Sequence, residues 1–270
     1  MNPIQLAISP CPNDTFIFGA LIQGWVPAPS PFELHFGDIE VLNEWAWHGS
    51  MDICKISIRA LAGLADYQLL DSGAALGFGC GPLVVTQADQ SGLDWGKVPI
   101  AVPGKRTTAS LLLRKWLIQQ QGVPAQDVEN GWHFIRFDHI LEGVQRGEFK
   151  VGLIIHESRF TYQQFGLHKL VDLGAWWEQT TGLPIPLGGI VGRKTLGSDL
   201  LEAWQEAIAA SVRFAWAQPE KLRPFMREHA TEMADEVMDQ HVGLYVNSFS
   251  ESLGSQGHRA ISFLLDQVGS

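Results

Sequence analysis

Cysteine and positive charge are both scarce in this sequence of 270 residues. Only three cysteines occur, Cys11, Cys54 and Cys80, and they have neither an even count nor a C-x-x-C spacing. This pattern argues against a disulfide framework and a zinc site, and it favours reduced thiols in the cytosol. Lysine and arginine total 19 against 29 aspartates and glutamates, a formal net charge of −10. Such a balance argues against nucleic acid or an anionic membrane as partner, because both need a basic face.

Long apolar runs and common nucleotide-binding motifs are also missing. No apolar run approaches the ~20 residues that span a bilayer, and the opening MNPIQLAISPCPND lacks the basic and apolar segments of an export signal. We therefore expect a cytoplasmic protein. The glycines before Pro82 do not form G-x-G-x-x-G, and neither a Walker loop nor a G-x-S-x-G elbow occurs. The nine histidines show no metal-ligating spacing, so no metal site is expected.

The sequence begins with a pattern typical of a strand, a stiff turn and a helix. Leu6 and Ile8 alternate with small or polar residues, and the turn from Ser9 to Asp14 contains two prolines. Asn13 and Asp14 are good N-cap residues, which predicts that the helix begins there. Its first N–H groups favour anions or polar oxygens, at the end of a strand where α/β sheets bind ligands. The alternative is an ordinary strand-to-helix connection.

Strands and helices alternate over most of the chain, which indicates an α/β fold. The expected strands are 32–36, 51–56, 67–70, 83–86, 98–102, 132–137, 151–155, 167–173 and the end of 183–191. The expected helices are 39–48 capped by Asp38, one through Leu64 capped by Ser57, one ending at Gln121, one capped by Asp138, 175–181, a long one from Ser198, 235–246 and 256–268. Extended segments near 82–86 and 187–191 predict two crossings between lobes around a cleft. Lobe 1 is expected at 1–84 and 189–270, and lobe 2 at 85–188.

His156 is the best candidate for acid–base chemistry. It follows the apolar run at 151–155, so we expect it at the carboxyl end of a strand, facing the cleft. An imidazole titrates near neutral pH and can transfer a proton without a metal. Glu157 and Arg159 could orient it or hold a substrate oxygen. The alternative is a histidine whose ring is satisfied by backbone groups at a helix start, and both interpretations stay open.

Lys55 and the pair Thr107 and Thr108 are candidates for binding a carboxylate. A cation directly after the apolar residues 53–54 is oddly placed unless it faces an opening, although a snorkelling surface lysine fits equally well. The two threonines offer hydroxyl groups beside the N–H groups of a helix start. Simple N-capping is the alternative, and it needs only one of them.

Several segments together resemble the 1,4-dihydroxy-6-naphthoate synthase family of the futalosine route to menaquinone. The resemblance rests on SPCPNDTFIFGAL at 9–21, KIS at 55–57, AALGFGCGPL at 74–83, TTA at 107–109, GLIIHESRFTY at 152–162, DLGAWWE at 172–178 and TGLPIPLG at 181–188. These segments span most of the first 190 residues. The opening and histidine segments are long and unusual in composition, which makes the match specific.

The resemblance implies a two-lobed fold like that of type II periplasmic solute-binding proteins, with the ligand in the cleft. It implies a cytoplasmic lyase that converts cyclic dehypoxanthinylfutalosine to 1,4-dihydroxy-6-naphthoate and dihydroxyacetone, with no metal or organic cofactor. By position, His156 matches the family's proton acceptor, and 55–57 and 107–108 match its substrate-contacting segments. The predicted substrate-binding residues are Lys55, Ile56, Ser57, Thr107 and Thr108, with Ser9, Asn13 and Arg159 added from the adjoining polar positions. The partner is a small carboxylate, with neither nucleic acid nor membrane, and the oligomeric state is left open.

Three other functions fit the same fold. A solute-binding protein for uptake would do no chemistry and should carry an export or lipid-anchor signal. Chorismate dehydratase is a sister enzyme, but the HES segment at 156–158 and the SPCPND opening favour the synthase. A ligand-sensing domain would normally be joined to a basic DNA-binding segment, which the sequence does not suggest.

Overall fold

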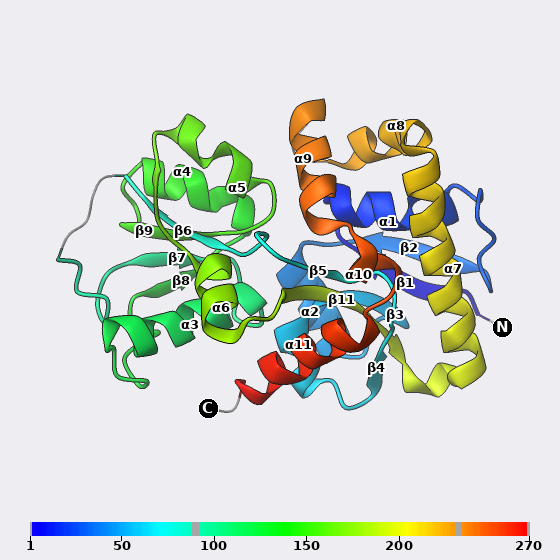
Figure 1. The fold of residues 1–270 in the computed structure, drawn as a ribbon, viewed down its shortest axis with the longest axis horizontal. Coiled ribbons are helices and arrows are strands. Elements are labelled where there is room, and N and C mark those ends of the chain that lie inside the picture. The colour runs from blue at the N-terminus through cyan, green and yellow to red at the C-terminus, as the bar shows by residue number, and fades with distance from the viewer. Residues whose placement is uncertain (1, 88–91, 231–233, 269–270) are drawn as a thin grey trace. The chain divides into compact units, whose positions relative to one another are not determined.

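The computed structural model describes residues 2–87, 92–230 and 234–268 of the chain. The chain divides into two compact units. The ribbon in Figure 1 is coloured along the chain, from blue at the N-terminus to red at the C-terminus. Unit 1 consists of Met1–Gly77 and Pro186–Ser270, and unit 2 of Phe78–Ile185. The lobe boundaries predicted from the sequence, 84/85 and 188/189, lie a few residues C-terminal to the boundaries between these two units.

The sheet of unit 1 has three mutually parallel strands, with β1 between β2 and β3. Its order is β2-β1-β3-β11-β4, with β5 paired to β11. These strands are β1 (Ile4–Ile8), β2 (Phe32–Phe36), β3 (Ile53–Ser57), β4 (Tyr67–Leu69), β5 (Ala75–Gly77) and β11 (Ile185–Arg193). β2 and β3 both run parallel to β1, whereas β11 runs antiparallel to β3 and β4.

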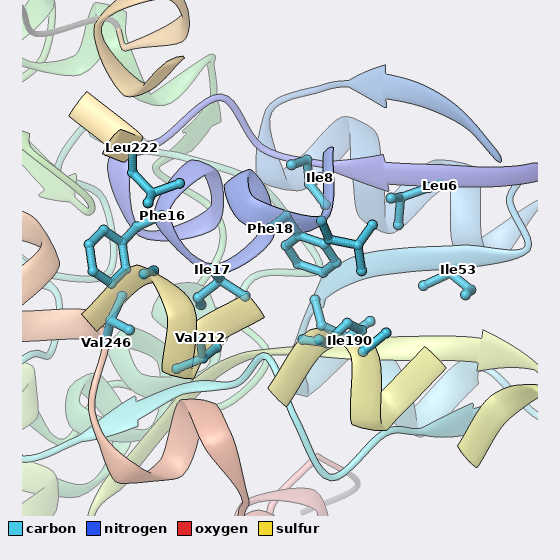
Figure 2. Close-up of a cluster of buried hydrophobic side chains, with 14 of the residues drawn as sticks. Leu6, Ile8, Phe16, Ile17, Phe18, Ile53, Ile190, Val212, Leu222 and Val246 are labelled. Carbon is cyan, nitrogen blue, oxygen red and sulfur yellow. The ribbon is translucent and has the colours of Figure 1, made fainter. Parts of the chain in front are cut away.

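Helices cover both faces of this sheet. Because side chains alternate along a strand, Leu6, Ile8 and Ile53 share one face, and Ala7 and Cys54 the other. The first face packs against α1, α7, α8 and α9 in one large cluster, part of which Figure 2 shows. The second face packs mainly against α2. The helices of unit 1 are α1 (Pro12–Ile22), α2 (Ile39–Trp47), η1 (Ile58–Gly63), η4 (Lys194–Leu196), α7 (Ser198–Ala217), α8 (Pro219–His229), α9 (Asp235–Tyr245), α10 (Ser248–Glu251) and α11 (Gly254–Asp266).

Unit 2 is built on a five-stranded sheet of order β10-β6-β9-β7-β8. Its strands are β6 (Leu83–Thr86), β7 (Ile100–Val102), β8 (Trp132–Phe134), β9 (Val151–Ile154) and β10 (His168–Asp172), and its helices are α3 (Thr108–Gln121), η2 (Phe137–His139), α4 (Ile140–Gln145), α5 (Ser158–Thr161), η3 (Tyr162–Phe165) and α6 (Leu173–Thr181). β7 runs parallel to β8 and β9, and β6 antiparallel to β9 and β10. Ile140 and Val144 of α4 pack in the cluster of buried side chains on this sheet.

The two sheets repeat one strand order. In unit 1 the chain passes from β1 to β2 on one side and then to β3 on the other. In unit 2 it passes from β7 to β8 and then to β9 in the same way. In open α/β sheets, ligands bind outside the carboxyl ends of the strands where the order reverses. The residues that follow β1 and β3, and those that follow β7 and β9, are therefore the candidates for a site.

Some details of the predicted elements are confirmed and others are wrong. β2 occupies 32–36 and α7 begins at Ser198, as predicted. α1 begins at Pro12 with Cys11 at the N-cap, because proline is favoured in the first helical position, so neither Asn13 nor Asp14 caps it. Ser57 precedes a 3-10 helix, but its side chain makes no capping bond.

Prolines account for two further differences. Helix α8 begins at Pro219 and continues past Pro224, although an internal proline argues against a helix at the sequence level. Pro186, expected in a stiff connection before a strand, lies inside the nine-residue β11.

Asp138 lies within η2 instead of capping a helix, and its carboxylate pairs with Arg136. No helix in the described ranges combines the length and apolar character that membrane crossing requires.

Candidate active site

The carboxyl ends of β1 and β3 bring together a group of buried polar side chains in unit 1. Lys55 alternates with Cys54 along β3, so it shares the face of Ile53, which α1 covers. Its ammonium group lies 2.7 Å from Asp14 Oδ1 in the first turn of α1. Only 4% of Lys55 and 1% of Asp14 are exposed. Lys55 is therefore a buried cation with a carboxylate partner and not a snorkelling surface lysine.

Asp14 organises the residues around it by accepting hydrogen bonds from three directions. Besides Lys55, the amide Nδ2 of Asn13 donates to its Oδ1 at 2.8 Å, and the backbone N–H of Ser9 donates to its Oδ2 at 3.1 Å. The Ser9 hydroxyl in turn accepts from the backbone N–H of Cys11 at 3.2 Å. Of the predicted residues, the structure thus joins Ser9, Asn13 and Lys55 around one carboxylate. Asp14 itself was expected only as a helix cap.

Ser57 and Ile56, the other predicted residues of this strand, have different surroundings. The backbone N–H of Ser57 donates to Asn43 Oδ1 at 2.8 Å, and Asn43 Nδ2 donates to the Ser57 hydroxyl at 3.1 Å. Asn43 is fully buried on α2, and no motif in the sequence pointed to it. The Ile56 side chain packs in the cluster beside α2, so it belongs to the core.

In unit 2, the turn after β7 leads into the N-terminus of α3. Thr107 is the N-cap, and its hydroxyl accepts from the backbone N–H of Ser110 at 3.1 Å and donates to the carbonyl of Gly104 at 3.0 Å. Thr108 is the first helical residue and is buried. No acidic side chain occupies the first turn of α3. Thr107 therefore acts as the N-cap of α3. The positive end of this helix dipole is not compensated by any carboxylate in the first turn of α3.

His156 follows β9, the strand that lies parallel to β7 in the same sheet. Its backbone φ is +55°, and it is the sole non-glycine residue with positive φ in the described ranges. The imidazole meets the Phe137 ring edge-on, with 4.9 Å between ring centroids. A bulky residue in the left-handed region carries strain, and such strain tends to be kept where it serves a function. The pairing of β7 with β9 places His156 and the start of α3 at the same edge of the sheet.

Arg159 is tied to structural groups of unit 2. One guanidinium nitrogen lies 2.8 Å from Asp172 Oδ2, and another donates to the backbone carbonyl of Gly81. Asp172 is the N-cap of α6 and accepts from the backbone N–H groups of Gly174 and Ala175, each at 3.0 Å. Arg159 therefore links the turn after His156 to the start of α6. Its proposed role on a substrate oxygen stays a prediction.

The three cysteines are buried and form no disulfide. Burial, with a smaller contribution from the nearby charge of Asp14, raises the pKa of the Cys54 thiol well above its ordinary value. Burial likewise raises the pKa of Cys80 to about 12, and Glu178 adds to the effect. Both thiols are therefore protonated at neutral pH, which does not suit a nucleophile.

Neither unit by itself gathers a metal-ligating cluster. Within the described residues of each unit, no three histidine, cysteine, aspartate or glutamate side chains come together at ligating distance. Unit 2 thus offers a histidine held in a strained turn and a helix N-terminus, and unit 1 offers a neutralised cluster of buried polar groups around Asp14.

Comparison with known proteins extends over nearly the whole chain. The model of a family described as menaquinone biosynthesis matches residues 4–269. A "1,4-dihydroxy-6-naphtoate synthase" of Thermus thermophilus is 48% identical over 269 residues, which cover 99% of this chain and 94% of that protein. A synthase of the same name from Streptomyces coelicolor is 46% identical over 271 residues, covering 99% and 93%.

Solved structures confirm the predicted fold. Protein AF1704 from Archaeoglobus fulgidus superposes with a TM-score of 0.89 at 30% identity, covering 99% of this chain and 97% of that one. A ligand-binding component of an ABC-type import system from Staphylococcus aureus gives 0.69 at 14% identity, covering 99% and 92%. The Candida albicans CA3427 gene product, described as having the generic periplasmic binding protein fold, gives 0.69 at 12%, covering 100% and 90%. The chain thus has the periplasmic-binding-protein-like α/β fold, with two mixed sheets flanked by helices.

Proposed function

Because this chain belongs to the menaquinone biosynthesis family, as its full-length match to two synthases shows, we propose that it makes 1,4-dihydroxy-6-naphthoate from cyclic dehypoxanthinylfutalosine. Membership makes it a lyase of menaquinone biosynthesis acting on a small molecule. The substrate and the mechanism are the further step. The sugar-derived fragment leaves as dihydroxyacetone, and the atoms of the substrate are divided between the two products.

The positive backbone φ of His156 is the observation on which this mechanism rests. A histidine at the end of a buried strand, held at φ +55°, is costly to keep, and it matches the expected proton acceptor by position. In its neutral form the imidazole can take a proton from a carbon of the sugar portion. The electron pair left behind starts an elimination that opens the ring, and aromatisation of the other part supplies the driving force. The protein's task is then mainly positioning and proton transfer.

The N-terminus of α3 is the best candidate to bind the substrate carboxylate. Lys55 is an unsuitable partner because its charge is already compensated by Asp14 at 2.7 Å, and a second carboxylate would compete for it. The start of α3 carries the positive end of a 14-residue helix and no acidic residue in its first turn. Thr108, the first residue of this helix, is the residue that we propose to contact the carboxylate.

The test is to incubate the purified protein with cyclic dehypoxanthinylfutalosine, without added cofactor, and to identify the products by mass spectrometry. We expect 1,4-dihydroxy-6-naphthoate and dihydroxyacetone in equal amounts. Binding followed by recovery of unaltered substrate would indicate a solute-binding protein. Dehydration of chorismate in a parallel incubation, with the futalosine derivative untouched, would indicate the sister enzyme of the same fold.

A further inference from the structure

The side-chain amide of Asn13 has one end bonded and one end without a protein partner. Its Nδ2 donates to Asp14 Oδ1 at 2.8 Å. Its carbonyl Oδ1 is buried, and no donor in the described parts of the chain reaches it. Asn13 as a whole is only 4% exposed. Buried acceptors are rarely left without a donor, because the water they give up on burial must be replaced.

The neighbours of Asn13 fix which end of the amide faces away from Asp14. An ionised carboxylate only accepts hydrogen bonds, and that of Asp14 is held in place by Lys55 at 2.7 Å and by the N–H of Ser9 at 3.1 Å. Turning the amide over would set its carbonyl oxygen against a carboxylate oxygen, and one hydrogen bond would become a repulsion. The acceptor is therefore constrained to point away from Asp14.

The position of Asn13 points to a ligand as the missing donor. It lies in the first turn of α1, directly beyond the carboxyl end of β1, at the place where the strand order of unit 1 reverses. The adjacent Lys55 and Asp14 cancel each other's charge, so this corner of unit 1 offers no net charge to an anion. A carboxylate has no proton to donate at neutral pH, whereas a hydroxyl group has one.

We infer that Asn13 Oδ1 accepts a hydrogen bond from a hydroxyl group on the sugar portion of the substrate, with Asp14 as the positioning residue that sets the direction of the amide. The inference rests on the proposed function for the identity of the substrate. It makes Asn13 a specificity-determining residue, because a site built around a substrate hydroxyl discriminates against an analogue that lacks it.

Binding of deoxy analogues tests this inference. Dissociation constants are measured by titration calorimetry in a His156→Asn background, in which turnover is slowed roughly 10²–10⁴-fold, so that little substrate is converted during the titration. The ligands are the substrate and each analogue lacking one hydroxyl of the sugar portion. With Asn13 present, one analogue should bind roughly 10–100-fold more weakly than the substrate. With Asn13→Ala, substrate affinity should fall by a similar factor, and the preference over that analogue should disappear.

A matched control is Asn130→Ala, because the Asn130 amide also donates to an aspartate, Asp127, but at an exposed turn. This variant should keep the full preference. A merely structural Asn13 would weaken all ligands equally and leave the preference unchanged, which would overturn the inference, as would equal binding of every analogue to the parent. Absence of substrate turnover by the wild-type protein would instead overturn the proposed function.

Discussion

Lys55 and Asp14 stabilise unit 1 only as a pair. With 4% and 1% of their surfaces exposed, neither could be left charged and alone without a large loss of solvation. Lys55→Met should lower the free energy of unfolding by about 3–5 kcal/mol, because it leaves the Asp14 carboxylate buried without its cation. Urea denaturation measures the change. Lys97→Met, which breaks an exposed pair with Asp94, should cost less than about 1 kcal/mol. Equal losses in the two variants would contradict this account.

His156 can be tested for chemistry and for strain with different substitutions. His156→Asn keeps a residue that tolerates positive φ but removes the base, so turnover should fall by roughly 10²–10⁴-fold while the melting temperature stays close to that of the parent. His156→Val also removes the base and should in addition cost about 1–3 kcal/mol, because a branched side chain fits this backbone poorly. Near-normal turnover in either variant would remove the histidine from the mechanism.

At this scale the sequence indicated which residues are polar where a strand ends, but not what they contact. Lys55 and His156 could be picked out because each follows apolar residues, and Thr107 because it lies at an expected helix start. The pairing of Lys55 with Asp14 joins residues 41 positions apart, and Asn43 meets Ser57 from another helix. Such contacts depend on how helices lie over the sheet, which local patterns do not encode.

At the scale of elements, the segment before β6 packs on the start of α6 through two glycines. A Cβ atom added to Gly81 would lie 2.2 Å from the Cα of Gly174, and Arg159 of α5 donates a hydrogen bond to the carbonyl of Gly81. The Gly174 group is backbone and Arg159 is ion-paired with Asp172, so neither can move aside easily to relax the contact.

Gly81→Ala should therefore lower stability by about 1–3 kcal/mol, as overpacking does. Thermal melting can compare it with Gly243→Ala, a substitution in α9 where an added Cβ meets nothing within 4 Å. That control should raise stability by about 0.5–1 kcal/mol, because alanine is the better helix former. A gain of stability in both variants would show that the Gly81–Gly174 contact is not tight.

Elements were predictable where one physical signal dominated. Strict alternation gave β2, and Asp38 caps α2 through bonds to the N–H groups of Glu40 and Val41, as expected. Helix α8 was missed because Pro224, which lies inside it, argues locally against a helix. Its Leu222 and Phe225 are nevertheless buried, Leu222 against α1 and α7, and tertiary packing outweighs the local preference.

For the molecule as a whole, the buried thiols link protonation to folding. The pKa of Cys80 rises on folding from 9.0 to about 12, and the pKa of Cys54 rises as well. Between these values the unfolded chain has lost thiol protons that the folded chain keeps. This contribution to stability is therefore complete below about pH 9 and is lost as the pH rises toward 12. Urea midpoints should fall from pH 8 to pH 10.5, and replacing both cysteines with alanine should reduce that fall.

The same burial predicts how the thiols react. At pH 8 a thiol reagent should modify Cys54 and Cys80 slowly in the native protein and rapidly in urea. Mass spectrometry of the labelled peptides identifies which residues have reacted. Rapid native labelling of either cysteine would show that its surroundings open to solvent without global unfolding.

An ion pair sealed from water responds little to dissolved salt, since screening by mobile ions acts through the solvent over ~10 Å at 0.1 M ionic strength. The bond between Lys55 and Asp14 should thus persist unchanged from dilute buffer to molar salt, and with it the orientation imposed on the neighbouring amide. Attraction of an anionic ligand to a helix end weakens under the same conditions. Raising the ionic strength would then reduce affinity while leaving the choice among hydroxylated ligands intact.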